Sequence, residues 1–234
     1  MKNIDKNNNN KIYQNRNYAN GSVTFLDVLG WKGIWQKRKD AITTLLTLIK
    51  EIETYSEYIT DEASNTREEA RGTNTTVLSI SDTIAIFTPG DPKITIPIHA
   101  KICSNAIPLS IEKRIPLKGA ISYGKFSFEK NIMVGPAVDE AASWHEATDW
   151  IGVVLTPSAK FNIDDVKLFD CVTEYNSIPF KKKVNNLNLC VKWAFNKREE
   201  INIIFNDMGP HIPEIAPKYL NTLEFINTVN RNRR

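Results

Sequence analysis

Cysteine is scarce in this chain, and long apolar runs are missing. The 234 residues include three cysteines that are widely spaced and form no Cys-x-x-Cys pair, namely Cys103, Cys171 and Cys190. This pattern disfavours a disulfide framework and a structural zinc site, so we expect buried thiols in a reducing compartment. No apolar stretch approaches the ~20 residues of a membrane-spanning helix, and no apolar segment directly follows the basic N-terminus. We therefore expect a cytoplasmic protein with no membrane partner.

A strong charge of either sign is also lacking. The formal net charge is +3, which is too small to indicate a nucleic-acid partner. Hydrophobic residues make up 41% and charged residues 24% of the chain, as in an ordinary globular protein, and the length suits one large domain. Residues 1–20 contain four consecutive asparagines. We expect them to form a disordered tail, because so polar a segment buries little apolar surface, and residues 21–234 to form the domain.

One short segment combines an acid, an apolar run and a glycine. The apolar run over residues 23–29 predicts a buried strand, and Asp27 lies near its end. Side chains alternate along a strand, so Phe25 and Asp27 share one face. A carboxylate there is costly to bury unless it is paired or metal-bound, although it could also cap a backbone turn. Gly30 allows close approach to a ligand, and the amphipathic pattern over residues 34–59 predicts a helix whose N-terminal amides suit phosphate.

A second acid has similar surroundings. Two β-rich runs, 77–80 and 84–87, meet at Ser81-Asp82-Thr83. They predict a tight hairpin with Asp82 at its tip. Such an aspartate is often only a turn former. On neighbouring strands, however, Asp27 and Asp82 could face each other and bind the hard divalent cations that arrive with phosphates. We interpret them as a metal-binding pair serving a nucleoside triphosphate.

The remaining pattern alternates helices and strands. It predicts a polar loop at 61–75, a helix at 93–113, a strand at 117–124, a hairpin arm at 126–134, a helix at 137–147, strands at 151–155, 167–172 and 187–194, and a helix at 214–230. This order implies an α+β sandwich, with an antiparallel-rich sheet and helices on one face. We interpret the run Lys181–Lys183 as a solvated turn and His145 as a structural residue.

Four pieces of this series resemble the catalytic domain of class III nucleotide cyclases, whose core is ferredoxin-like. They are the strand end Asp27-Val28-Leu29-Gly30-Trp31, the hairpin Asp82, the strand Gly119–Gly124 and the helix start Gly135–Ala141. The resemblance covers residues 22 to 160, and makes residues 21–234 a nucleotide cyclase-like domain.

The departures from that family point to a subgroup. Asp139 and Ser143 stand where the family has Asn and Arg, and Leu78 and Ile132 replace polar residues that read a purine. A site without matched hydrogen bonds cannot read that base strongly. The chain is most similar to the bacterial pyrimidine cyclases of antiphage Pycsar systems, which make cyclic UMP or cyclic CMP.

The resemblance implies a two-metal reaction that converts UTP to 3′,5′-cyclic UMP and pyrophosphate. Asp27, Asp82 and the backbone carbonyl of Val28 would hold two divalent cations, Mn²⁺ or Mg²⁺. Asp139 of a partner chain would bind the ribose. The expected nucleotide-binding residues are Phe25, Leu29, Gly30, Trp31, Lys32 and Lys118.

The resemblance also implies a head-to-tail homodimer with two composite sites, because class III sites form between two domains. A downstream effector would sense the cyclic nucleotide. Four alternatives stay open: a cytidylate cyclase, a purine cyclase, a non-catalytic nucleotide-binding regulator, and a nuclease-like two-metal protein, which the absence of a broad basic pattern disfavours.

Overall fold

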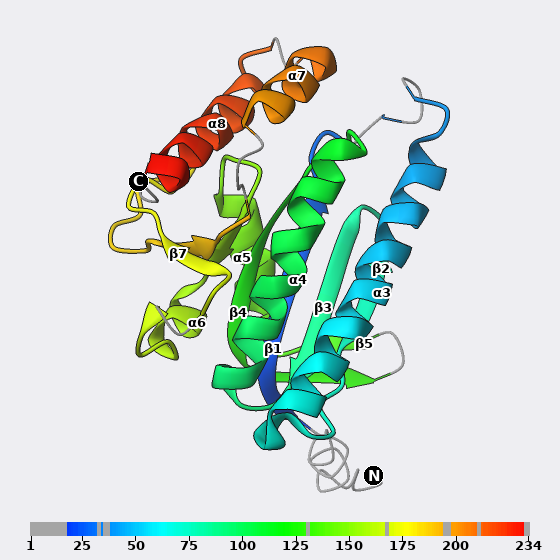
Figure 1. Cartoon of the computed structure of the whole chain (residues 1–234), viewed down its shortest axis with the longest axis vertical. Helices are drawn as coiled ribbons and strands as arrows, with labels where there is room; N and C mark the ends of the chain where they lie inside the picture. Colours follow the sequence, from blue (N-terminus) through cyan, green and yellow to red (C-terminus); the bar gives the residue numbers. More distant parts are fainter. Residues whose placement is uncertain are drawn as a thin grey trace, which may run out of the picture.

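The chain folds around a mixed sheet, shown in the computed structural model of Figure 1. The structure describes residues 18–31, 34, 38–129, 132–166, 169–193, 198–209 and 212–231. Residues 1–17 of the expected tail and Lys32 lie outside these ranges. The strand order is β2-β3-β1-β4-β6-β8-β7, and β5 pairs with β4. The named strand pairs are antiparallel, except that β4 and β6 are parallel. The predicted α+β class with an antiparallel-rich sheet is confirmed.

The strands and helices have definite bounds. The strands are β1 (Ala19–Val28), β2 (Thr76–Ile80), β3 (Thr83–Pro89), β4 (Leu117–Glu129), β5 (Ile132–Val134), β6 (Val153–Leu155), β7 (Val172–Glu174) and β8 (Leu189–Val191). The helices are α3 (Ala41–Thr66), the 3₁₀ turn η1 (Glu68–Ala70), α4 (Pro92–Glu112), α5 (Pro136–Ala147), α6 (Pro157–Phe161), α7 (Arg198–Met208) and α8 (Ala216–Arg231).

Strand β1 lies between β3 and β4 and contributes to two apolar clusters. Leu26 and Val28 are buried in the larger core, whereas Val23 and Phe25 belong to a smaller cluster. This division follows the alternation of side chains along a strand. The β1–β4 approach requires a glycine at position 119, since a Cβ there would lie 2.4 Å from the carbonyl oxygen of Phe25. The strand predicted for residues 23–29 is therefore confirmed and is longer at its N-terminal end.

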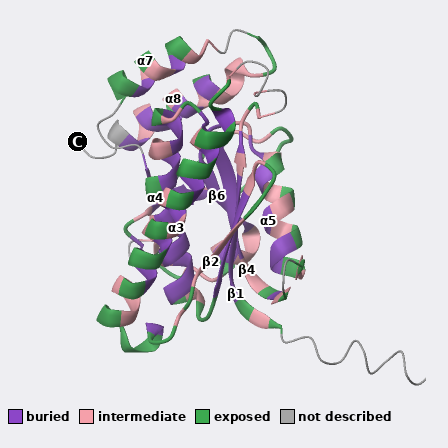
Figure 2. Cartoon of the chain, turned by 90° about the vertical axis from the view of Figure 1, so that its right-hand side faces the viewer, coloured by how far each residue is buried: buried purple, intermediate pink, exposed green. Residues whose placement is uncertain are grey.

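Helices cover both faces of the sheet. Figure 2 shows α3 and α4 on one side and α5 on the other. The prediction of helices on one face is therefore wrong. Helix α5 packs on β1 and β4, and its small apolar side chains Ala137, Val138 and Ala141 join the smaller cluster. That short apolar stripe is enough to bury one side of the helix against the sheet.

Helix α3 differs from its predicted bounds at both ends. It begins at Ala41 and continues to Thr66, through residues predicted as a polar loop. Ile42 and Leu46 are 60% and 61% exposed. The helix buries a different apolar stripe, comprising Leu45, Leu48, Ile49, Ile52 and Ile59. Two apolar stripes share this helix, and periodicity alone does not decide which one packs.

The C-terminal third departs most from the predicted pattern. The strand expected at 167–172 is instead β7, and that expected at 187–194 is the shorter β8. Helix α7 was not anticipated from the sequence. The helix predicted at 93–113 is α4, which continues through Pro97 and Pro108 to Glu112. In Figure 1, α7 and α8 lie together at one end of the molecule.

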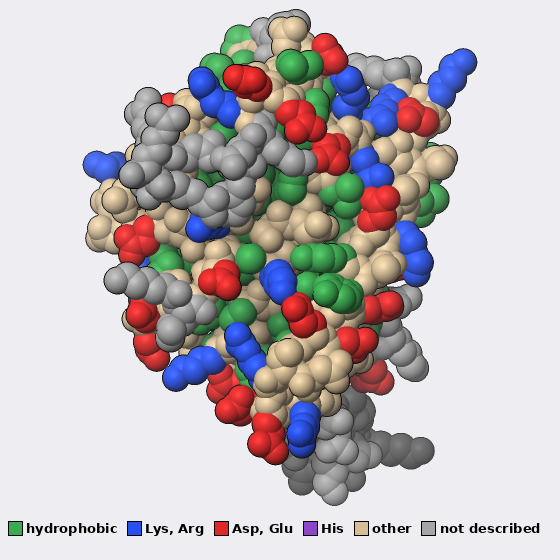
Figure 3. Space-filling view, viewed as in Figure 1, with side chains coloured by type: hydrophobic (Ala, Val, Ile, Leu, Met, Phe, Trp, Pro, Cys, Tyr) green, Lys and Arg blue, Asp and Glu red, His purple; other side chains and the backbone are tan. Residues whose placement is uncertain are grey.

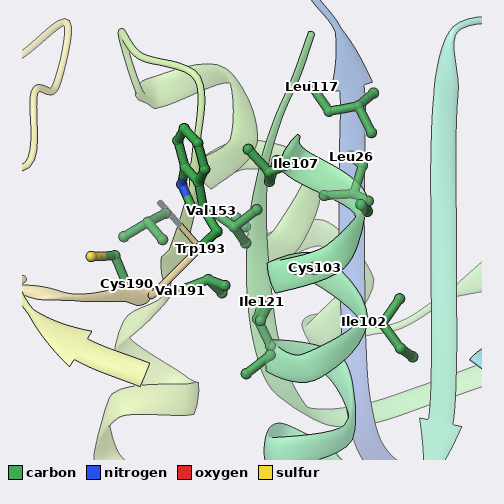
Figure 4. Close-up of a cluster of buried hydrophobic side chains, with 14 of the residues drawn as sticks. Leu26, Ile102, Cys103, Ile107, Leu117, Ile121, Val153, Cys190, Val191 and Trp193 are labelled. Carbon is green, nitrogen blue, oxygen red and sulfur yellow. The ribbon is translucent and has the colours of Figure 1, made fainter. Parts of the chain in front are cut away.

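The larger core lies between the sheet and α4. Figure 4 shows Leu26, Ile102, Ile107, Ile121 and Val153 among its buried side chains. All three cysteines are free thiols: Cys103 and Cys190 are buried and Cys171 is half-buried. On the face seen in Figure 3, the described acidic and basic side chains are interspersed rather than separated by sign. Among the described helices, none has the length and apolar character needed to cross a bilayer.

Candidate active site

A pocket of about 580 Å³ opens where β1 ends and the β2–β3 hairpin turns. Its lining brings together three acids, two lysines and a histidine, and consists of Phe25, Asp27, Ile80, Asp82, Thr83, Lys118, His145, Glu146 and Lys181. Four of these residues, Phe25, Asp27, Asp82 and Lys118, were predicted as site residues. The structure places those four around one cavity.

Asp27 is fixed by the strands on either side of it. In the sheet register it lies opposite Thr83 of β3 and Lys118 of β4. The Lys118 Nζ is 3.6 Å from the Asp27 Oδ2 and donates a hydrogen bond of 2.9 Å to the carbonyl of His145. Burial raises the pKa of Asp27, although Lys118 and then His145 oppose that shift. Burial likewise lowers the pKa of Lys118, against the attraction of Asp27.

Asp82 lies in the predicted hairpin, which is confirmed. Strands β2 and β3 pair up to Ile80 and Thr83, so Ser81 and Asp82 form the turn. Ser81 has a φ of 58°, as tight hairpin turns require. The turn is joined to β1, because the amide of Val28 donates a 3.1 Å hydrogen bond to the carbonyl of Asp82. The negative charge of Asp82 contributes to raising the pKa of Asp27, so the two carboxyl groups are close enough to interact.

The donor set of this pocket fits divalent cations. Asp27 and Asp82 supply hard oxygen ligands, and a cation beside them would relieve the repulsion and burial that raise the pKa of Asp27. The described residues contain no group of three or more His, Cys, Asp or Glu side chains that could hold a metal by themselves. A cation here would therefore take its other ligands from a bound phosphate compound and from water.

His145 lies in the pocket, although it was interpreted as a purely structural residue. Its ring stacks on that of Phe25, with a centroid separation of 6.0 Å and an interplanar angle of 20°. Burial lowers the pKa of His145, and the positive charge of Lys118 lowers it further. The sequence contained a signal that His145 faces the sheet: Val138, Ala141 and His145 have helical spacing and share the buried face of α5.

Lys181 also lines the pocket, and it is exposed at a bend, as expected of a solvated turn. Its backbone amide donates a 2.9 Å hydrogen bond to the carbonyl of Ala147, just beyond His145 and Glu146. No local signal distinguishes this lysine from Lys182 and Lys183. Lys181 reaches the pocket because its segment pairs with the end of α5, which is distant in the sequence.

The backbone after Asp27 takes a different form from the one expected. The Leu29 amide donates a 2.9 Å hydrogen bond to the carbonyl of Pro116, so it is not free to bind phosphate. Leu29 and Trp31 pack against the larger core, and neither they nor Gly30 line the pocket. Gly30 has a φ of 72°, which favours glycine. The long helix does not begin here, because α3 starts at Ala41.

Asp139 is exposed in the first turn of α5 and does not line the pocket of its own chain. Its carbonyl accepts a 2.7 Å hydrogen bond from the Oγ of Ser143, the residue that stands where an arginine was expected. Two tryptophans on and after α5, Trp144 and Trp150, pack with the larger core and do not line the pocket. Trp150 is fully buried and stacks on Tyr175, and Trp144 meets Phe180 edge to face.

No protein-family model and no curated protein matches this chain. It is similar to a structure of a bacterial light-regulated adenylyl cyclase, with a TM-score of 0.46 and 11% identity over 84% of this chain and 60% of that one. A second such structure gives a TM-score of 0.46, 9% identity, and coverage of 84% and 59%. The chain thus spans about three fifths of the length of these light-regulated cyclases.

Another similar structure is the catalytic core of a rhodopsin-guanylyl cyclase with converted specificity, in complex with ATPαS. The TM-score is 0.46, with 14% identity over 75% of this chain and 96% of that one.

Proposed function

We propose that this chain is a nucleotide cyclase of the class III type that converts UTP to cyclic UMP and pyrophosphate. One observation carries the proposal: Asp27 and Asp82 come from separate segments, line one pocket and interact electrostatically. Paired carboxylates at a pocket suit the cations that accompany a triphosphate. The product would act on an effector that senses cyclic nucleotides in antiphage defence, as the resemblance to Pycsar cyclases implies.

The residues of the pocket divide into three roles. Asp27, Asp82 and the carbonyl of Val28 would hold two divalent cations, Mn²⁺ or Mg²⁺. When bound, such cations supply charge that stabilises the attacking and leaving oxygens. Lys118 lies 3.6 Å from Asp27 and favours its ionised form. The stacked rings of Phe25 and His145 line one wall of the pocket.

The reaction is an intramolecular phosphoryl transfer. The ribose 3′-oxygen bonds to the α-phosphorus and its proton passes to solvent. The bond between the α-phosphorus and the bridging oxygen breaks, and pyrophosphate leaves with that electron pair. The chain's own residues hold the triphosphate so that the 3′-oxygen lies in line with the leaving group.

A pyrimidine substrate is supported by the two positions at which the resemblance places base-reading residues. Leu78 is half-buried against the smaller apolar cluster, and Ile132 is 67% exposed on β5. Neither side chain has a hydrogen-bonding group with which to read a purine edge. The same side chains do not separate UTP from CTP, so cytidylate cyclase is the second candidate.

The test is turnover of each of the four ribonucleoside triphosphates with Mn²⁺ or Mg²⁺, with the products resolved by mass. We expect cyclic UMP. Asp27→Asn and Asp82→Asn should each lower the rate at least about a hundredfold, because each removes a charged ligand. Asp61→Asn, an exposed change on α3, should leave the rate unchanged.

Near-normal turnover by either pocket variant would overturn the metal assignment. A cyclic purine product would overturn the pyrimidine assignment and leave the cyclase proposal intact. If wild-type protein turned over none of the four nucleotides, the proposed activity would be wrong. Thermal unfolding of each variant shows whether its loss of activity is caused by loss of the folded structure.

A further inference from the structure

We propose that Lys181 is the residue that binds the phosphate chain of the substrate, and that Lys118 serves chiefly to position Asp27. This assignment rests on the proposed function for the identity of the substrate. It concerns a lysine that the sequence does not distinguish from its two neighbours. The two lysines of the pocket differ in what they contact, and that difference carries the assignment.

Lys118 is already engaged. Its Nζ lies 3.6 Å from the Asp27 carboxylate and donates a hydrogen bond of 2.9 Å to the His145 carbonyl. Its side chain is only 6% exposed. Moving this ammonium towards a ligand would leave Asp27 and a buried carbonyl without a partner, which is costly. Lys118 is therefore suited to fixing Asp27 rather than to following a mobile anion.

Lys181 is free to bind an anion. It lines the pocket, is exposed, and makes no ion pair with any residue that the structure describes. Its positive charge also contributes to lowering the pKa of Lys118, which indicates that the two ammonium groups are neighbours. An anion between them would relieve this repulsion, because each lysine would gain an opposite charge.

The backbone around Lys181 is held in place although its side chain is free. Its amide donates to the carbonyl of Ala147, and the amide of Asp149 donates a 2.8 Å hydrogen bond to the carbonyl of Pro179. Thr148 and Phe180 form an antiparallel bridge. This short pairing fixes the segment before Lys181 beside the end of α5, so little ordering is needed when a ligand binds.

The ligand that fits is a flexible polyanion. Two of the three acids, Asp27 and Asp82, would carry cations in the proposed function, and these cations meet the same phosphates. A lysine ammonium is a point charge with three rotatable donors, which suits phosphate oxygens whose positions change between substrate and pyrophosphate. The nucleobase offers no such charge, so we assign Lys181 to the phosphate chain.

The experiment compares Lys181→Ala with Lys183→Ala, which removes an exposed lysine two residues away that does not line the pocket. The first probe is inorganic tripolyphosphate without metal, measured by calorimetry. We expect its Kd to rise about tenfold in Lys181→Ala and to change less than about twofold in Lys183→Ala. In turnover assays, KM for the nucleotide should rise more than kcat falls, and Lys181→Arg should recover most of the affinity.

Equal tripolyphosphate affinity in the two alanine variants would overturn the assignment of Lys181, even if the wild type is an active cyclase. The assignment would also fail if Lys181→Arg bound as weakly as Lys181→Ala. Loss of turnover by the wild type with every nucleotide would instead overturn the proposed function. The tripolyphosphate comparison would then still decide whether Lys181 binds phosphate.

Discussion

His99 is a fully buried residue between two strands. Its Nδ1 lies 2.6 Å from the Oγ1 of Thr24, and its Nε2 lies 2.9 Å from the Oγ1 of Thr88. Thr88 continues the network to Thr75 and then Thr60. Burial lowers the pKa of His99 from 6.5 to about 3. The histidine is thus neutral in the folded protein and joins α4 to the sheet by hydrogen bonds.

This burial makes stability depend on pH. Between pH 6.5 and 3 the unfolded chain protonates this histidine and the folded chain does not, so the free energy of unfolding falls as pH falls. From pH 7 to pH 5 the loss from His99 should be about 2 kcal/mol. Denaturant unfolding at the two pH values measures it. His99→Gln, though less stable at pH 7, should show a correspondingly smaller loss, and equal losses in both proteins would contradict the prediction.

Helix α8 supports the loop that leads from α5 to β6. The Oγ1 of Thr222 accepts a 2.8 Å hydrogen bond from the amide of Ile151, and both residues are fully buried. Lys218 forms a 2.9 Å ion pair with Asp149, and Asn221 donates to the carbonyl of Asp149. The same loop pairs with the segment before Lys181. A helix far along the chain therefore helps to position one wall of the pocket.

Thr222→Val should destabilise the protein by about 2 kcal/mol, because the buried amide of Ile151 would lose its acceptor. Thr228→Val is the matched control. Thr228 lies on the same helix and also donates to the carbonyl four residues earlier, but it accepts no bond from another segment among the residues that the structure describes. Its replacement should change stability by less than about 0.5 kcal/mol. Equal effects in urea unfolding would show that the amide of Ile151 is not the cause.

The elements that local pattern predicts well include the two that carry Asp27 and Asp82. Strand β1, the β2–β3 hairpin and α5 each follow from a run of adjacent residues, because alternation, turn chemistry and helical spacing act over short distances. The stripe that α3 buries could not be read in this way, since Ile42 and Leu46 are as apolar as the residues that pack. The choice depends on the shape of the sheet and α4 beneath it.

The pocket itself was predicted in part. The acids Asp27 and Asp82 were found because a carboxylate within an apolar run, or at a hairpin tip, is conspicuous. His145 and Lys181 were missed because they reach the pocket through tertiary packing, by α5 lying on β1 and by the bridge between Thr148 and Phe180. Lys32 lies outside the described residues, so its role stays a prediction.

At the scale of the whole molecule, the predicted head-to-tail dimer would complete the proposed site. Asp139 is exposed on α5 and does not reach the pocket that holds Asp27 and Asp82. A head-to-tail dimer would bring the Asp139 of each chain to the pocket of the other, forming two composite sites. Ile80 at the rim of the pocket and Ile132 on β5 are 53% and 67% exposed, and such a partner would cover them.

Mixing inactive variants tests this arrangement. Asp27→Asn and Asp139→Ala should each be inactive alone, but a mixture should regain about a quarter of the wild-type rate. About half of the dimers are then mixed, and each mixed dimer has one intact site. A mixture of Asp27→Asn with Asp82→Asn is the control, since every site would carry one defect. Activity of Asp139→Ala alone, or recovery in the control, would contradict the composite site.

The position of β1 between β3 and β4 has a consequence for synthesis. The strand is made first, yet both of its neighbours come later, and β4 begins only at Leu117. At ribosomal rates this delay is roughly 5 to 20 s. During that interval the apolar strand β1 lacks at least one of its two pairing partners, and its unpaired edge is accessible to other nascent chains. Chaperones that bind unfolded nascent segments at the ribosome should therefore raise the yield of this protein more than chaperones that act after its release from the ribosome.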